Sequence, residues 1–515
     1  MKNFLLTLIF TLFCLAILTL SLRGNKGNPT IDELNQNYWK DDGPLELSPD
    51  RGRYALTYSV LEDKSVHFSL PVARFTTPDL GYINGKFASL FAPGVSYLIM
   101  PGYLIGQSLG FSQVGAFAVI SLFALINVLL LRAIAIKLGA NHLAATISSL
   151  VFIFATPAFT YAVSLYQHHI STFLILLSLY IFVRFNNAWS LGIIWILCAL
   201  SIIIDYPNLF LMLPIGVYAL GRLIQIKSKE KFTISIKPLG FLTLLTVALP
   251  LSFFLWFNNV SYNNPLQFSG TIKAVKMLDD KGQPVENQDY TALPSQPKSL
   301  GQREKSSVGF FNPRNLLTGF NIHFVSGDRG IVFYTPVMLL GIIGAIISYK
   351  NKDKFVPILL AIIGFNLLLY SMWGDPYGGW AFGSRYLIPS YAILSIFLAI
   401  ALTKFSKNKI MILLFLVLAI YSIAVNTLGA VTSSRNPPKA EAVPLSQVSG
   451  RQEKYTYERN WDYLLENKSK SYLWRSWAGS YLTAREYYLL ISSVLILIVL
   501  ILTTGLTLKG GNKND

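Results

Sequence analysis

Long apolar runs recur along the chain and predict membrane-spanning helices. A helix needs about 20 apolar residues to cross the hydrocarbon core of a bilayer. The first run, residues 4–22, is longer than the apolar core of a typical signal peptide, so we expect a retained anchor. Further runs lie at residues 113–137, 143–166, 169–185, 189–204, 207–226, 238–257, 331–348, 355–373, 386–403, 409–430 and 488–508. The pattern predicts an all-α polytopic membrane protein with about 12 transmembrane helices and long outer loops that carry amphipathic helices.

One apolar stretch, residues 89–109, differs from these runs. It contains Pro93, Gly94, Pro101 and Gly102, which would leave backbone groups without partners in a helix exposed to lipid. We therefore expect a re-entrant or interfacial helix pair that does not cross the membrane alone.

Positive charge is distributed unevenly between the two sides that this topology defines. The chain has 43 Lys and Arg against 26 Asp and Glu, a net charge of +17. With a cytoplasmic N-terminus, the short outer loops hold only Arg385. The short inner loops hold Arg132, Lys137, Arg184, Arg222, Lys227, Lys229, Lys231, Lys237, Lys350, Lys352, Lys354, Lys404, Lys407 and Lys409. This asymmetry follows the positive-inside rule, so the charge is an orientation signal that requires no nucleic acid partner.

The composition excludes a soluble globular protein. Only 13% of the residues are charged, whereas roughly 25% is usual for soluble domains. Cys14 and Cys198 both lie inside apolar runs. The sequence therefore implies neither a disulfide framework nor a Cys/His metal site.

Three long segments, residues 23–112, 258–330 and 431–487, lie outside the membrane in this topology, and long loops of this kind usually carry function. We divide the chain into a catalytic membrane domain at 1–430, an outer loop or small extracytoplasmic region at 431–487, and a final helix with a cytoplasmic tail at 488–515. The spans hold almost no ionisable residues, which argues against an ion-coupled transporter and for chemistry at the outer surface.

The first outer segment contains the run Pro49-Asp50-x-x-Arg53-Tyr54. The apolar spacing after Pro49 predicts a short amphipathic helix on the membrane surface, with Ser48 as its N-cap and Asp50 in its first turn. Asp50 has two interpretations. It is a catalytic carboxylate, or it is an acid that only interacts favourably with the helix dipole.

This run resembles the first outer loop of the GT-C membrane glycosyltransferases, in the branch of the protein O-mannosyltransferases and the bacterial transferase that adds aminoarabinose to lipid A. The acid of the family's Pro-Asp-Glu-x-x-Tyr motif is catalytic, and the resemblance gives that role to Asp50, with Tyr54 as a substrate-binding candidate. Arg51 replaces the second acid of the motif. The family's phosphate-binding lysine is missing from Phe91-Ala92-Pro93-Gly94, and Lys86 is the substitute that we consider.

The resemblance implies a sugar donor carried on polyprenyl phosphate. Such a donor needs no nucleotide-binding glycine-rich loop, and none is visible. The transfer reaction needs a carboxylate that accepts the proton of the acceptor hydroxyl, and cations that stabilise the departing phosphate. The runs at 326–330, 373–380 and 383–386 continue the likeness into later outer turns.

Three arginines are candidates for holding the donor. Arg385, beside Gly383, either grips a phosphate through its planar fork or anchors the membrane interface. Arg53 either orients Asp50 or reaches the donor, with surface solvation as the alternative. Arg329 is the third candidate for binding the donor, and its alternative role is an ion pair with loop acids or a helix cap.

Other polar residues compete for roles at the outer face. His168 and His169, at the outer end of a span, are either substrate-binding residues or hydrogen-bonded boundary residues. Asp205 lies two residues before Pro207, a position from which its carboxylate can cap the next helix. The pair Asp32-Glu33 is a rival for the catalytic acid, but its polar neighbours favour a solvated loop.

We therefore predict an inverting glycosyltransferase that uses a polyprenyl-phosphate-linked sugar and a cell-envelope acceptor at the outer face of the cytoplasmic membrane. The alternatives are a lipid-linked glycan ligase, polymerase or flippase and, from another class, a secondary transporter. No cofactor is assigned. A divalent metal ion stays open, because Asp50, Asp328 and Asp375 could meet in space. The identities of the sugar and the acceptor also stay open.

Overall fold

The computed structural model describes residues 2–40, 42–227, 233–236, 238–285, 311–450 and 452–511. Helices dominate, and in the described part of the chain five are long and apolar enough to cross a membrane. These are α7 (Ser112–Lys137), η1 with α14 (Leu242–Tyr262), η5 with α19 (Arg385–Lys404), α20 (Lys409–Val431) and α24 (Ala484–Gly511). They indicate a multi-pass membrane protein.

Shorter apolar helices occupy the remaining predicted spans. They are α1 (Lys2–Ser21), α8 (His142–Phe154), α10 (His168–Arg184), α11 (Ala188–Ile204), α12 (Asn208–Leu223), η4 with α17 (Pro336–Lys350) and α18 (Val356–Ser371). The hydrophobic pattern therefore located the apolar helices correctly. Because several have fewer than about 20 residues, the number of crossings stays a prediction.

The predicted span at 143–166 is wrong as a single helix. Helix α8 ends at Phe154, and α9 (Ala158–Ala162) begins after Pro157. Proline at this point cannot donate to the preceding turn, so the helix is interrupted. The chain then runs through residues 163–167 before α10, and this irregular stretch forms part of the site described below.

The stretch at 89–109 contains one helix, α6 (Gly94–Ser108), and not the predicted pair. Pro101 lies inside it. Glycine allows α6 to pack closely on α7, since a Cβ at Gly102 would lie 2.3 Å from the carbonyl oxygen of Gly115. Whether α6 crosses the bilayer stays a prediction.

The all-α prediction also needs correction, because the structure contains two small sheets. Strands β1 (Leu80–Ile83), β2 (Lys86–Ser89) and β5 (Lys273–Val275) form an antiparallel sheet in the order β2-β1-β5. Asn84 and Gly85, with φ of 50° and 75°, form the tight turn between β1 and β2, as expected for an Asn-Gly hairpin. Strands β3 (Ile224–Lys227) and β4 (Thr233–Ile236) pair in the basic loop after α12. Lys229, Lys231 and Lys237 of that loop lie outside the described residues.

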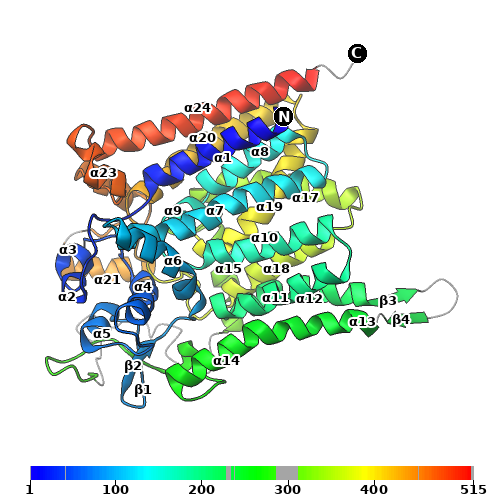
Figure 1. Ribbon diagram of the computed structural model, residues 1–515. Helices are drawn as coiled ribbons and strands as arrows, with labels where there is room; N and C mark the ends of the chain where they lie inside the picture. The colour runs from blue at the N-terminus through cyan, green and yellow to red at the C-terminus, as the bar shows by residue number, and fades with distance from the viewer. Residues whose placement is uncertain are drawn as a thin grey trace.

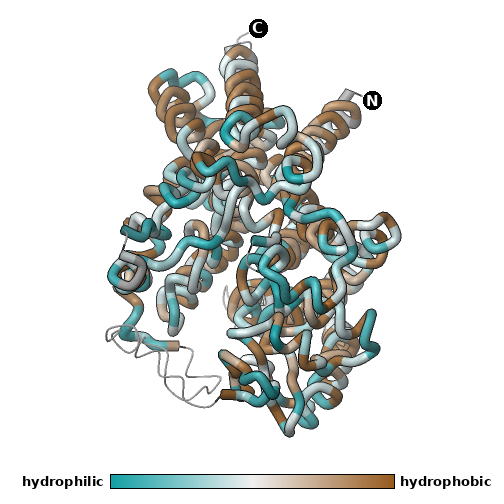
Figure 2. Tube along the Cα trace, turned by 90° about the vertical axis from the view of Figure 1, so that its left-hand side faces the viewer, coloured by the Kyte–Doolittle hydropathy of each residue, from teal (hydrophilic) through white to brown (hydrophobic). Residues whose placement is uncertain are grey.

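Figure 1 shows the three segments predicted to lie outside gathered at one end of the apolar helices, on the left of the view, with both ends of the chain at the other. Figure 2 looks onto this loop-bearing end, where hydrophilic stretches are frequent. Residues 286–310 of the second segment lie outside the described residues. The short helices of these segments and of the linkers are α2 (Ile31–Leu34), α3 (Asn37–Lys40), α4 (Ser48–Leu61), α5 (Leu70–Thr76), α13 (Pro238–Phe241), η2 (Ser269–Thr271), η3 (Pro313–Asn315), α15 (Leu316–Phe324), α16 (Ile331–Tyr334), α21 (Lys439–Ser449), α22 (Glu458–Leu465), α23 (Tyr472–Ser476) and η6 (Ala478–Ser480).

Candidate active site

Helix α4 is buried, and its prediction as a surface amphipathic helix is wrong. Asp50 and Tyr54 are completely enclosed and Arg53 is only 4% exposed. Ser48 is not the N-cap, because the helix begins after Leu47, and the Ser48 hydroxyl donates to Asp79 instead. The α4 segment packs against α6 on one side, while its polar residues meet the turn between α9 and α10.

Asp50 has the environment of a general base. Its Oδ1 accepts a hydrogen bond from the backbone N–H of Leu165 at 2.8 Å, and its buried Oδ2 has no hydrogen-bond partner among the described residues. Burial raises the pKa of Asp50 to about 6, against the opposing effect of the Arg23 and Arg53 charges. A carboxylate with such a pKa is ionised near neutral pH yet basic enough to take a proton.

Arg53 connects Asp50 to a second carboxylate. Its Nη2 donates to Gln167 Oε1 at 2.6 Å and its Nη1 donates to the carbonyl of Leu165 at 3.1 Å. Gln167 in turn donates to Asp205 Oδ2 at 2.9 Å. Burial raises the pKa of Asp205 as well. Asp205 therefore belongs to the same polar cluster, rather than acting only as a helix cap.

Arg385 enters the cluster from η5, before α19. Its guanidinium carbon lies 4.6 Å from the centre of the Tyr166 ring, and that of Arg53 lies 5.3 Å from the same ring. The Nε and Nη1 atoms of Arg385 are buried and have no hydrogen-bond partner within the described ranges. Two cations thus meet at one tyrosine, and each has a buried donor without a partner among the described residues, since the Nε of Arg53 is also unpaired.

The two predicted histidines have different surroundings. The His168 ring stacks on Tyr166, with centroids 5.8 Å apart, and its Nε2 is buried without a partner in the described part of the chain. His169 Nε2 lies 2.7 Å from the carbonyl oxygen of Ala158, and Asn127 donates to its backbone carbonyl at 2.8 Å. His168 joins the cluster, whereas His169 ties α10 to its neighbours.

Three other predicted residues do not contribute a group to this cluster. Lys86 is exposed on β2, and the Tyr54 hydroxyl lies 3.2 Å from Ser112 Oγ. Arg329 is buried, and its guanidinium hydrogen bonds within the described residues all go to backbone carbonyls. The carbonyls are those of Asp328, Tyr377, Gly379 and Asn436.

The rival acid pair has a local structural role. The backbone N–H of Thr30 donates to Glu33 Oε2 at 2.7 Å, which forms a capping box at the start of α2. Asp32 is exposed in the same turn. Neither acid has the enclosed setting of Asp50.

The described residues contain no group of three His, Cys, Asp or Glu side chains that could hold a metal ion. All three aspartates considered for such a site accept hydrogen bonds from backbone N–H groups, Asp50 from Leu165 as described above. Asp328 Oδ2 accepts from Lys439 at 3.0 Å, and Asp375 Oδ1 accepts from Tyr377 at 3.1 Å.

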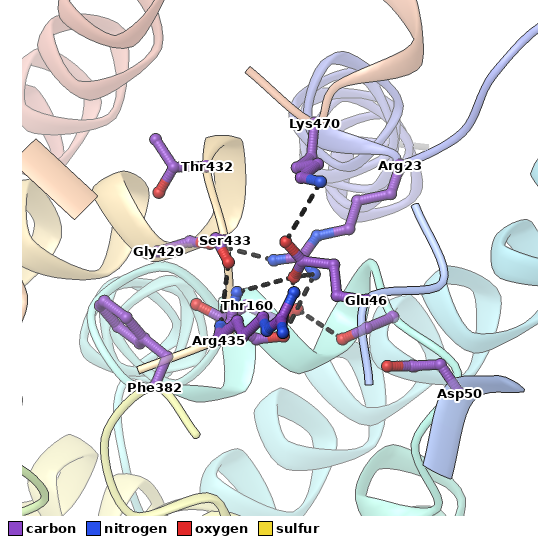
Figure 3. Close-up of polar contacts among 12 residues, drawn as sticks. Arg23, Glu46, Asp50, Thr160, Phe382, Gly429, Thr432, Ser433, Arg435 and Lys470 are labelled. Atoms are coloured by element: carbon purple, nitrogen blue, oxygen red, sulfur yellow. Dashed lines mark hydrogen bonds and ion pairs between the residues drawn. The ribbon is translucent and has the colours of Figure 1, made fainter. Parts of the chain in front are cut away.

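A buried ionic group adjoins the cluster (Figure 3). Arg23 Nη1 lies 2.8 Å from Glu46 Oε2, and Lys470 Nζ lies 3.5 Å from Glu46 Oε1. Burial alone would raise the pKa of Glu46, but the charges of Arg23 and Lys470 lower it to about 2. Arg23 and Glu46, both from the first outer segment, act electrostatically on Asp50.

Sequence reasoning missed Gln167, Tyr166 and the Arg23–Glu46 pair. A signal existed for Arg23, since it immediately follows the anchor on the side where the positive-inside rule disfavours cations. Tyr166 and Gln167 precede His168 at the outer end of a span, but they have no distinctive spacing.

Comparisons with known proteins give structural likenesses alone. No family model matches the sequence, and no curated protein matches it. The structure is similar to ArnT from Cupriavidus metallidurans in the apo state, with 12% identity and a TM-score of 0.47, over 98% of this chain and 78% of that one. The same protein bound to undecaprenyl phosphate gives 14% identity and a TM-score of 0.44, over 98% and 77% of the two chains.

An oligosaccharyltransferase from Archaeoglobus fulgidus, in complex with Zn and sulfate, is also similar. It shares 15% identity with a TM-score of 0.40, over 88% of this chain and 56% of its own length. Both proteins are GT-C membrane glycosyltransferases, the family that the first outer segment resembles. At TM-scores below 0.5 these are likenesses only.

Proposed function

We propose that the chain is an inverting glycosyltransferase that moves a sugar from a polyprenyl-phosphate donor to a cell-envelope acceptor outside the cytoplasmic membrane. The observation that supports this most is the cluster of one buried carboxylate and two guanidiniums around Tyr166. Under this proposal the apolar helices cross the membrane, and the end that carries the cluster faces outward.

Asp50 acts as the base in the proposed reaction. Its free Oδ2 accepts the proton of an acceptor hydroxyl. The acceptor oxygen forms a bond to the anomeric carbon of the donor, while the bond from that carbon to the phosphate oxygen breaks. The electron pair leaves with the polyprenyl phosphate. Attack opposite the leaving phosphate inverts the anomeric configuration.

Arg385 and Arg53 hold the phosphate in this scheme. The guanidinium of Arg385, whose Nε and Nη1 donors are free, is a planar group of the kind that binds phosphate oxygens in pairs. Arg53 adds a second positive charge beside the same tyrosine. Because both guanidiniums are largely removed from water, their interaction with the charge that develops on the leaving phosphate is stronger than at a solvated surface. His168 and Tyr166 line the same position, where they are suited to contact the sugar.

The test is an Asp50→Asn variant of the full-length protein, assayed for transfer with a polyprenyl-phosphate sugar pool. Asparagine keeps the size and can still accept the Leu165 hydrogen bond, but it cannot take a proton. We expect turnover to fall by roughly 10²–10⁴-fold. Asp32→Asn, which removes an exposed acid from the same segment, should keep wild-type activity. A folded Asp50→Asn protein with full activity would refute the proposal.

A further inference from the structure

A cavity of about 280 Å³ lies beside the candidate active site. Two of its walls come from the chain segments that carry the catalytic groups. Glu46 precedes Asp50 by four residues, and Trp380 precedes Arg385 by five. Glu46 also acts electrostatically on Asp50. The cavity therefore lies beside the segment that carries Asp50, which is not itself a lining residue, and residues of the third outer segment form much of its wall.

Cations outnumber acids in the cavity wall. The lining holds the acids Asp42 and Glu46 and the cations Arg435, Arg459, Lys468 and Lys470. Glu46 is already paired with Arg23 and Lys470, so it does not neutralise the remaining cations.

Arg435 is the cation of this wall for which the described residues provide no acid partner. Its side chain is exposed and forms no ion pair among the described residues. Arg459, in contrast, lies 2.9 Å from Glu453, and Lys468 lies 2.7 Å from Glu466. One unpaired guanidinium is thus available to a ligand.

Trp380 brings the two arginines of the cavity together. The guanidinium carbons of Arg435 and Arg459 lie 5.3 Å and 5.6 Å from the centre of its indole ring. Trp380 Nε1 donates to Glu441 at 2.7 Å, which fixes the orientation of the ring. Because Arg459 is paired with Glu453, the charge at this ring that a bound anion would neutralise is that of Arg435. The indole also offers an apolar face of the kind on which a sugar ring stacks.

We propose that this cavity binds the acceptor, and that the acceptor is a saccharide that carries an anionic group. This assignment rests on the proposed function, since it gives Asp50 its substrate. Arg435 and Arg459 hold the anion, Trp380 stacks on the sugar, and the position beside Glu46 brings a hydroxyl towards Asp50. The donor phosphate then lies at Arg385, so the two substrates reach Asp50 from different sides.

The test is calorimetric titration of the purified full-length protein with glucose 6-phosphate, glucose and inorganic phosphate, without donor. We expect glucose 6-phosphate to bind at least about tenfold more tightly than either of the other two. Loss of a charge-assisted hydrogen bond in Arg435→Gln or Arg459→Gln should weaken this binding by about tenfold or more. Trp380→Ala should weaken binding of the phosphosugar more than binding of phosphate.

Lys454→Gln is the matched control. It removes one cation from the same outer segment, where Lys454 pairs with Asp462 at 2.7 Å and does not line this cavity. Wild-type affinity in this variant supports the site, whereas a loss equal to that of Arg435→Gln would show a general charge effect and overturn it. Absence of binding, equal binding of glucose, or equal binding of free phosphate would also overturn the proposal. Failure of the proposed function has a different signature, which is full transfer activity in Asp50→Asn.

Discussion

The Asp50 carboxylate accepts the backbone N–H of Leu165, a residue 115 positions further along the chain, at 2.8 Å. This bond fixes Oδ1 and leaves Oδ2 free in a buried setting. It also favours the ionised form, so it acts against the larger effect of burial on the pKa of Asp50. A single backbone group thus orients the proposed base while the surrounding protein makes it more basic.

The pKa of Asp50 predicts the pH dependence of transfer. Burial raises this pKa from 3.8 to about 6, so Asp50 is protonated and unable to act as a base below that pH. We expect kcat/KM to rise with pH through about 6 and then to level off. Asp32→Asn should keep this acidic limb, and the residual activity of Asp50→Asn should lack it. An acidic limb that persists in Asp50→Asn would assign the titration to another group.

The free donors of Arg385 predict a specific effect on the donor substrate. Arg385→Ala should lower kcat/KM for the polyprenyl-phosphate donor by roughly 10²-fold, the scale of losing one charge-stabilising donor. Lysine at this position should restore only part of the rate, because a point charge does not reproduce the planar fork. Arg314→Ala, which removes an exposed arginine from η3, should behave as wild type. If alanine and lysine variants both keep full donor use, Arg385 is an interfacial anchor.

The Arg23–Glu46 pair predicts that breaking a buried ion pair lowers the stability of the fold much more than breaking an exposed one. Glu46→Gln leaves Arg23 and Lys470 buried without their carboxylate, which typically costs about 3–5 kcal/mol. Glu466→Gln breaks an exposed pair with Lys468 and should cost about 0–1 kcal/mol. The midpoints of thermal unfolding of the two variants in detergent measure this difference in stability. Equal midpoints would show that the buried network contributes little to stability.

The same network predicts a pH effect on stability. The pKa of Glu46 in the folded protein is about 2, below its ordinary value of 4.5, so Glu46 stabilises the fold at pH values above 4.5. This contribution should be lost progressively as the pH falls from about 4.5 towards 2. Glu46→Gln should remove that part of the acid sensitivity. The measurement is the unfolding midpoint of variant and wild type at each pH, and the difference between them should shrink as the pH falls.

Hydrophobic patterning predicted the apolar helices because their lengths and lipid-facing compositions are local properties. It failed where tertiary packing decides the outcome. The α4 segment has the spacing of a surface helix, yet contacts with residues 165–167 and with α6 bury it. The hairpin at Asn84-Gly85 had a sequence signal, but β5 joins its sheet from a distant segment, which spacing along the chain does not show.

The candidate site was predictable only in part. Asp50 and Arg385 were predicted because one resembles a motif and the other is an isolated outer cation, and their roles stay predictions. The contacts of Gln167 with Arg53 and Asp205 depend on how helix α4 meets the turns before α10 and after α11. Arg329 is a predicted substrate-binding residue that lies outside this cluster. Its charge suggested a substrate contact, but four backbone carbonyls occupy its donors.

The last prediction concerns which end of the molecule faces outward. Asp280 and Lys350 are exposed, and they lie in segments that the charge asymmetry assigns to opposite sides. In a background with Cys14 and Cys198 replaced by alanine, an impermeant maleimide should label Asp280→Cys in intact cells. Lys350→Cys should react only after permeabilisation, because positively charged short loops are retained on the cytoplasmic side. The cysteine-free background should not react under either condition. Labelling of Lys350→Cys but not Asp280→Cys in intact cells would invert the orientation and place Asp50 and Arg385 on the cytoplasmic side, where the proposed outer acceptor could not reach them.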